Sequence, residues 1–185
     1  MKIKKVFIQA FRAYNHEKDG SFDFTNSDGS NSDFVAIYAP NGVGKSSFYD
    51  AVEWALTNNV DRFIRGHYKT LNQKEAVNAK SDKVPQLILR NNQASPETST
   101  KVTIHRDNDA IIENELPPIR TNGRDLKFDK RDNTPNSDGY RDIFLSQDAI
   151  DSFIRETKAE DRYKVFMDHF EVDADETRKK IFIIK

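Results

Sequence analysis

Cysteine is absent from this chain of 185 residues, and no run of about 18 apolar residues occurs in it. The absence of cysteine excludes a disulfide framework, thiolate metal ligands and thiol redox chemistry. The absence of a long apolar run predicts that no segment spans a membrane. Excess charge of one sign is also missing. The formal net charge is -1, which gives no global basic signature for nucleic acid but leaves room for a local basic patch.

Targeting and metal signals are equally sparse. Residues 1–5, MKIKK, are basic but lack the apolar segment of a signal peptide, so we expect a cytoplasmic protein, with nucleoid association left open. The four histidines are scattered without metal-ligand spacing. Hydrophobic residues make up 36% of the chain and charged residues 32%, a thin apolar content for this length. This balance predicts long polar loops, or a core completed by another chain or segment.

Residues 39–47, APNGVGKSS, are close to the Walker A phosphate-binding pattern, which is Gly, four residues, then Gly-Lys-Ser/Thr. Gly44, Lys45 and Ser46 fit the pattern, whereas Ala39 stands where the first glycine is expected. The apolar run before the loop, residues 34–38, is typical of a buried parallel strand, and apolar residues recur at helical spacing after the loop. A strand, loop and helix in this order aim backbone N–H groups and a helix N-terminus at a phosphate.

Each polar position of the loop has a chemical role toward ATP and Mg²⁺. Gly42 and Gly44 let the backbone approach the phosphates, where a Cβ would intrude. Lys45 supplies positive charge to the β- and γ-phosphates. The Ser46 hydroxyl is a Mg²⁺ ligand, and Ser47 donates to an α-phosphate oxygen. The alternative, an ordinary glycine-containing turn before a helix, requires the strand, the Gly-Lys-Ser core and the helix to coincide by accident.

Hydrophobic periodicity and turn residues outline the rest of the chain. Strands are predicted at residues 3–11, 22–24, 34–38, 86–90 and 143–145, and as a hairpin at 102–104 and 110–112. Helices are predicted from the P-loop to about Asn58, from Ile150, from Thr157 with its capping-box partner Glu160, and from about Asp175. Loops are predicted at residues 25–33 and 117–139, the second with one short strand around Leu126 and Phe128.

Several stretches in chain order resemble one family. These are FRAY at residues 11–14, FDF at 22–24, the P-loop followed by FYDAV, and FLSQ at 144–147. Together they resemble the SMC-like ATPases, the ABC-type heads of chromosome-maintenance and double-strand-break-repair proteins, including SbcC- and RecF-like relatives. The likeness covers nearly the whole chain but is loose between residues 61 and 139.

The resemblance implies an α/β P-loop NTPase half-domain. Its N-terminal antiparallel strands come first, then strand, P-loop and helix, and then C-terminal helices that lead toward a coiled coil. Residues 1–174 would form the N-terminal lobe of the head, with a polar, loop-rich insertion at about 61–139. Residues 175–185 would begin the coiled-coil arm.

The resemblance also implies roles for single residues. Gln147 would be the Q-loop glutamine, which binds Mg²⁺ or its water and reports the γ-phosphate, and it would join Lys45 as a catalytic residue. Arg12 matches an arginine near the nucleotide phosphates. Asn41 would contact the γ-phosphate, and Val43 belongs to the nucleotide-binding loop. The alternatives are a solvated glutamine at a strand end and a surface arginine beside a strand.

Two motifs of a complete head are missing from the sequence. A Walker B strand needs four apolar residues before Asp-Glu, and the nearest approach, residues 110–113, is one apolar residue short with Asn114 after the acid. Gly-Gly never occurs, so there is no Ser-Gly-Gly signature. In the family both motifs lie in a C-terminal half beyond a long coiled coil. We therefore expect half a head, either a cut fragment or a naturally split protein.

The expected function is ATP binding and hydrolysis coupled to head dimerisation, in DNA repair, DNA maintenance or anti-phage defence. The expected partners are the C-terminal half of the head, a second head, DNA, and a nuclease subunit. A stand-alone P-loop phosphotransferase and a nucleotide-binding scaffold that never hydrolyses ATP are the alternatives. A GTPase is disfavoured, because no glycine has an aspartate three positions before it.

Overall fold

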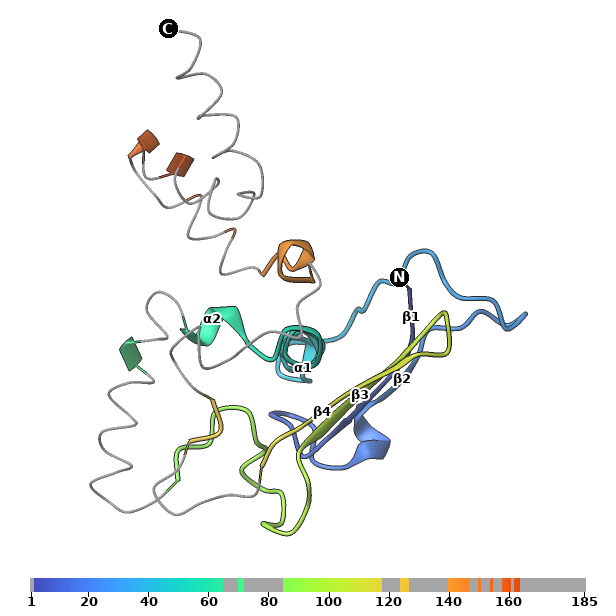
Figure 1. The fold of residues 1–185 in the computed structure, drawn as a ribbon, viewed down its shortest axis with the longest axis horizontal. Helices are drawn as coiled ribbons and strands as arrows, with labels where there is room; N and C mark the ends of the chain where they lie inside the picture. Colours follow the sequence, from blue (N-terminus) through green and yellow to red (C-terminus); the bar gives the residue numbers. More distant parts are fainter. Residues whose placement is uncertain are drawn as a thin grey trace, which may run out of the picture. The chain divides into compact units, whose positions relative to one another are not determined.

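The computed structural model describes residues 2–64, 70–71, 85–117, 124–126, 140–146, 150, 154, 158–160 and 162–163. The chain divides into two compact units, Met1–Ser137 and Asp138–Lys185. In the first unit, helix α1 (Lys45–Thr57) lies over one face of an antiparallel sheet, and the short helix α2 (Asp61–Ile64) follows it (Figure 1). The second unit contains the 3-10 helix η2 (Tyr140–Ile143).

The sheet has the strand order β2-β1-β3-β4 and is antiparallel throughout. Its strands are β1 (Ile3–Gln9), β2 (Ser21–Asp23), β3 (Lys101–Arg106) and β4 (Ile111–Glu115), and the 3-10 helix η1 (Glu17–Gly20) precedes β2. Val6 lies opposite Ile104, and Ile8 opposite Val102, and all four side chains are buried. Strand β1 also pairs with β2, and β3 pairs with β4, which confirms the predicted pairing of the first two strands and the predicted hairpin.

Helix α1 covers the buried face of the sheet, with the indole of Trp54 stacked on Phe11 at a centroid distance of 5.4 Å. Asn58 adopts φ 54°, the left-handed conformation of a C-cap, and its N–H donates to the carbonyl of Trp54. The Asn114 side chain of β4 donates to Trp54 O and Asn58 Oδ1, which ties the helix end to the sheet. The predicted end of this helix, at about Asn58, is confirmed.

Aromatic rings fix the other end of α1. The ring of Phe48, in the first turn, packs edge-on against Phe22 of β2 at 4.7 Å and against Phe24 at 6.0 Å. Tyr14 completes the cluster, also edge-on to Phe22. Because Tyr14 lies in the β1–β2 connection, and Phe22 and Phe24 lie in and just after β2, these rings anchor the start of α1 to the edge strand of the sheet.

The prediction of a buried strand at residues 34–38 is wrong. The segment forms no strand, and its side chains are exposed, with Phe34 at 84% and Tyr38 at 98%. A strand needs a neighbour that satisfies its backbone N–H and C=O groups. Among the described residues, no strand lies beside this segment to supply that pairing.

Two other predicted strands are also wrong. Residues 86–90 make only isolated bridges, Gln86 to Arg124 and Arg90 to Phe11, because the Asp125 side chain takes up N–H groups of the segment. Residues 143–145 contain the end of η2 and an irregular stretch, and Ile143 and Leu145 are exposed. A short apolar run favours burial, but it does not specify which strand it pairs with.

The C-terminal predictions can be checked only in part. Residues 150, 154, 159–160 and 162–163 are helical, as predicted for two of the helices. Leu126 is buried, but it does not lie in the short strand that was predicted around it. Gln147, Phe128, Thr157 and the helix from Asp175 lie outside the described residues, so the domain boundary at 174/175 stays a prediction.

Candidate nucleotide-binding site

The loop between residue 39 and α1 has the backbone that its glycines require. Gly42 has φ 87° and Gly44 has φ 103°, in the left-handed region that favours glycine. Ala39 is not among the residues with positive φ, so its Cβ is tolerated where the Walker A pattern has glycine. The irregularity in the sequence therefore has no cost in backbone conformation.

The loop leads directly into the N-terminus of α1. Gly44 is the N-cap residue and provides no side-chain cap. The first intrahelical bond runs from the Phe48 N–H to the carbonyl of Gly44 at 2.8 Å, so the N–H groups of residues 45–47 have no partner within the helix. A helix start of this kind carries partial positive charge and binds anions.

The Lys45 ammonium lies within the curve of the loop. It donates to the carbonyls of Ala39, at 2.5 Å, and Pro40, at 2.7 Å. Ser46 is exposed at the first turn of the helix, and Ser47 is buried. The start of this helix therefore offers one ammonium, uncapped N–H groups and two hydroxyls. A polyphosphate needs donors of these kinds, so the residues present fit ATP.

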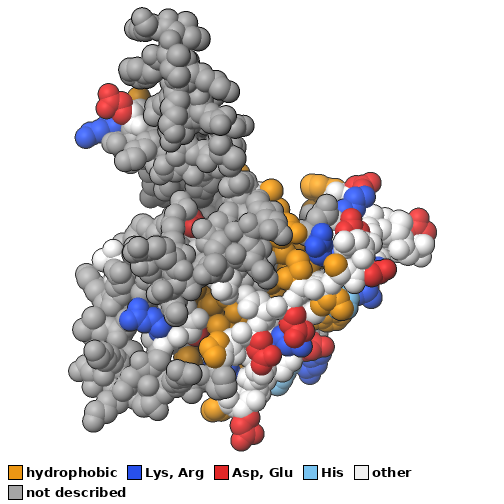
Figure 2. Space-filling model, in the orientation of Figure 1, with side chains coloured by type: hydrophobic (Ala, Val, Ile, Leu, Met, Phe, Trp, Pro, Cys, Tyr) orange, Lys and Arg blue, Asp and Glu red, His pale blue; other side chains and the backbone are white. Residues whose placement is uncertain are grey.

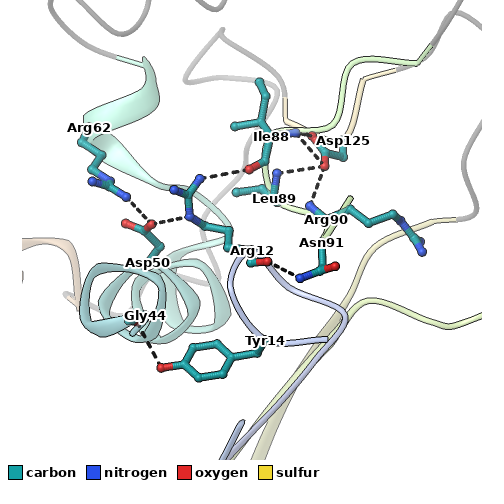
Figure 3. Close-up of polar contacts among 10 residues, drawn as sticks. All are labelled: Arg12, Tyr14, Gly44, Asp50, Arg62, Ile88, Leu89, Arg90, Asn91 and Asp125. Carbon is teal, nitrogen blue, oxygen red and sulfur yellow. Dashed lines mark hydrogen bonds and ion pairs between the residues drawn. The ribbon is translucent and has the colours of Figure 1, made fainter. Parts of the chain in front are cut away.

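Tyr14 holds the loop where it enters the helix. Its hydroxyl donates to the carbonyl of Gly44 at 3.1 Å, and burial raises the pKa of the hydroxyl, which therefore keeps its proton (Figure 3). A Cβ at Gly44 would lie 3.1 Å from this hydroxyl and 3.2 Å from the Cβ of Ala13. A Cβ at Gly42 would meet nothing within 4 Å, so the loop is packed on one side and open at its tip.

Three charged side chains, Arg12, Asp50 and Arg62, form a cluster at one side of α1. The fully buried carboxylate of Asp50 forms an ion pair with Arg12, whose Nε lies 2.9 Å away, and accepts a hydrogen bond from Arg62 Nη2 at 2.5 Å (Figure 3). Both guanidinium groups also lie over the ring of Phe63, at 4.7 and 4.6 Å from its centroid. Asp50 is five residues after Lys45, about 8 Å along the helix axis.

Glu53 lies one turn further along α1 and is almost completely buried. Burial, with smaller contributions from Asp61 and Asp50, raises its pKa to about 7, while Arg62 and the N–H of Asp61 oppose the shift. That N–H donates to Glu53 Oε1 at 2.9 Å. Near neutral pH this carboxyl group is therefore partly protonated and adds little negative charge to the cluster.

The predicted site residues are brought together to different degrees. Those of the loop and the first turn of α1 lie on one continuous segment: Asn41, Gly42, Val43, Gly44, Lys45, Ser46 and Ser47. Arg12 lies beside that helix through its pair with Asp50, and Gln147 lies outside the described residues. Contact of each with a nucleotide stays a prediction.

The sequence reasoning assigned no role to Tyr14, Asp50, Arg62 or Asp125. Tyr14 and Asp50 belong to the FRAY and FYDAV stretches, which were available as a signal. Arg62 and Asp125 lie in polar surroundings with no pattern that singles them out. Within the described ranges, no group of three or more His, Cys, Asp or Glu side chains is placed to hold a metal ion. The part of the chain that the structure describes also has no helix long and apolar enough to cross a bilayer.

The loop and the start of α1 have the arrangement expected of a P-loop NTPase, a class whose fold is α/β. A comparison with protein families agrees, because the model described as an AAA domain matches residues 5–183. The chain belongs to this family of SMC- and RecF-like AAA ATPases, which in general bind ATP and Mg²⁺. The comparison with curated proteins gives no match.

Proposed function

We propose that this chain is the ATP- and Mg²⁺-binding N-terminal half of an SMC-like ATPase head, of the kind found in SbcC- and RecF-like proteins. The observation that carries the proposal is the donor set at the start of α1. Lys45 lies inside a loop whose glycines have positive φ, and an uncapped helix N-terminus follows. The family match supports ATP as the ligand over other anions.

Each loop residue then has a defined task. Lys45 binds the β- and γ-phosphates as a point charge, and the N–H groups of the loop and first turn bind phosphate oxygens. Ser46 and Gln147 hold Mg²⁺, which supplies charge neutralisation between the phosphates when it is bound. Asn41 contacts the γ-phosphate and Ser47 the α-phosphate. The Arg12 guanidinium, held beside α1 by Asp50, adds positive charge near them.

The exposed segment 34–38 supports a second part of the proposal, that another sheet strand pairs with it. The apolar side chains of this segment, which directly precedes the loop, are exposed to solvent. Such a run of exposed apolar side chains, with Phe34 and Tyr38 at its ends, is typical of an interaction surface. A C-terminal half of the same head would cover this segment and supply the Walker B acid. The signature motif of a second head would close the nucleotide site, so ATP would drive dimerisation and hydrolysis would reverse it.

A role on DNA, in repair, maintenance or anti-phage defence, with or without a nuclease subunit, is proposed from the family resemblance. On the face seen in Figure 2, acidic and basic side chains are interspersed. Lys5 pairs with Asp23 at 2.8 Å, and Lys101 pairs with Glu113 at 2.7 Å. These sheet lysines are therefore partly neutralised, and we expect DNA to be contacted elsewhere on the assembled head.

The test is to measure ATP turnover and oligomeric state for the chain alone and mixed with a candidate C-terminal half. We expect the chain alone to bind ATP with negligible turnover, and the mixture to dimerise and hydrolyse it. Fast turnover by the isolated monomer would contradict the half-head. Binding without turnover in both samples would favour the non-hydrolysing scaffold. Turnover that needs only an added acceptor would favour a phosphotransferase.

A further inference from the structure

The backbone at Arg12 is strained. Arg12 has φ 46° and Ala10 has φ 49°, both in the left-handed region that residues with a Cβ rarely adopt. Such conformations persist only where the surrounding structure over-determines them, and they are concentrated at functional sites. The surrounding structure must therefore hold Arg12 in this conformation.

Residues 88–91, named here the brace, hold Arg12 by its backbone and its side chain (Figure 3). The Arg12 N–H donates to Leu89 O at 2.7 Å, and its Nη1 donates to Ile88 O at 3.1 Å. In return, Asn91 Nδ2 donates to Arg12 O at 2.5 Å. The Asn91 N–H also donates to the carbonyl of the other strained residue, Ala10, at 2.9 Å.

Asp125 fixes the brace from the opposite side. Its carboxylate accepts the backbone N–H groups of Ile88, Leu89 and Arg90, at 2.8, 2.9 and 2.8 Å. Because the brace is not part of the sheet, these three N–H groups are satisfied by one side chain that lies 35 to 37 residues away in the sequence. Burial raises the pKa of Asp125, and the hydrogen bonds from the three N–H groups offset part of this effect.

We propose that Asp125 is a positioning residue for the nucleotide site, which acts through the brace to hold the Arg12 guanidinium beside α1 for contact with an anionic group of the bound nucleotide. The inference rests on the proposed function, since it needs a nucleotide at the loop. Asp125 itself touches no nucleotide. Its removal weakens binding only to the extent that Arg12 loses its position.

A double-mutant cycle on the full 185-residue chain tests this, with ATP affinity measured by calorimetry in the presence of Mg²⁺. Arg12→Ala and Asp125→Asn are each expected to weaken ATP binding about tenfold, the effect of losing one well-placed charged contact. The double variant is expected to bind no more weakly than Arg12→Ala alone. Additive losses would overturn the proposal, because a general structural role of Asp125 would act equally with and without Arg12.

Two further variants keep the test decisive if Asp125→Asn folds poorly. Asn91→Ala removes the bond to the Arg12 carbonyl without touching Asp125, and it is expected to show the same lack of additivity with Arg12→Ala. Asp23→Asn is the matched control, because Asp23, at the exposed end of β2, also accepts a backbone N–H, from Thr25. Its ATP affinity is expected to equal that of the wild type.

Failure of the inference differs from failure of the proposed function. If Lys45→Ala abolishes ATP binding while Arg12→Ala and Asp125→Asn both bind normally, the loop assignment stands and the positioning role is overturned. If Lys45→Ala binds ATP as the wild type does, or the wild type binds none, the proposed function fails and the inference fails with it.

Discussion

Arg12, in the connection between β1 and β2, forms an ion pair with Asp50 of α1, with Nε 2.9 Å from Oδ2. The Asp50 carboxylate is completely buried, and it also accepts a hydrogen bond from Arg62 of α2. One side chain thus fastens the N-terminal turn and the start of α2 to the helix that carries the P-loop. The family resemblance predicted a role for Arg12 but none for its partner Asp50.

The first prediction concerns this buried carboxylate. Asp50→Asn removes the buried carboxylate charge that pairs with both guanidinium groups, and we expect the free energy of unfolding to fall by about 3 kcal/mol. Urea denaturation measures the change. The control is Asp33→Asn, which removes an exposed ion pair with Lys2 and is expected to leave the midpoint close to that of the wild type. Equal midpoints for the two variants would rule out a stabilising role for the Asp50 cluster.

The second prediction compares two glycines. Gly42 and Gly29 have φ 87° and 81°, and a Cβ at either position meets nothing within 4 Å. Alanine at each is therefore expected to cost a similar amount of stability, about 1–2 kcal/mol, from the left-handed backbone alone. Only Gly42→Ala is expected to weaken ATP binding, because its Cβ would face the phosphates. Calorimetry that gives the same ATP affinity for both variants would contradict a phosphate cradle at Gly42.

The third prediction concerns the hydroxyl of Tyr14. Tyr14→Phe keeps the ring in its aromatic cluster but removes one of the two donors to the Gly44 carbonyl, with the Phe48 N–H remaining, at an expected cost of about 1 kcal/mol. Tyr38→Phe removes a hydroxyl from a side chain that is almost fully exposed, and it serves as the control. Thermal unfolding measures both. An unchanged melting temperature in Tyr14→Phe would mean that the bond contributes nothing to the position of the loop.

The fourth prediction is a pH dependence caused by Glu53. Its pKa rises from 4.5 to about 7 in the folded chain, so the folded state binds this proton more tightly than the unfolded state. Stability is therefore expected to fall as pH rises from about 4.5 to about 7, by about 3 kcal/mol, and to level off above. Glu53→Gln keeps an acceptor for the Asp61 N–H and removes this decline. Urea denaturation at pH 5 and pH 8 compares the two proteins; identical declines would exclude Glu53 as the source.

Local sequence patterns were sufficient for the elements that depend on neighbours in the chain. The alternation at residues 22–24 and 102–104 predicted strands that the structure contains as β2 and β3, and the spacing of apolar residues predicted α1 with its end at about Asn58. The glycines of the loop were predictable because positive φ is a requirement of the backbone at those positions. These features need no information about distant residues.

Long-range pairing was not predictable in the same way. Residues 34–38 have the composition of a buried strand, but pairing depends on a neighbour that the described part of the first unit does not supply. The contacts of Asp125 with the brace span more than 30 residues of sequence, as do those of Arg12 with Asp50. Hydrophobic periodicity identifies apolar residues that face a core, but it carries no information about polar partners that are distant in the sequence. The roles of Asp50 and Asp125 were therefore not predicted.

The most direct measurement of the central claim is the ATP affinity of Lys45→Ala in the presence of Mg²⁺, with Lys2→Ala as the control. Lys45→Ala is expected to weaken ATP binding by about a hundredfold, because the loop loses its charged contact with the phosphates. Circular dichroism is expected to match the wild type, and Lys2→Ala is expected to bind ATP normally. Wild-type ATP affinity in a folded Lys45→Ala protein would contradict the assignment of residues 39–47 as the nucleotide-binding loop.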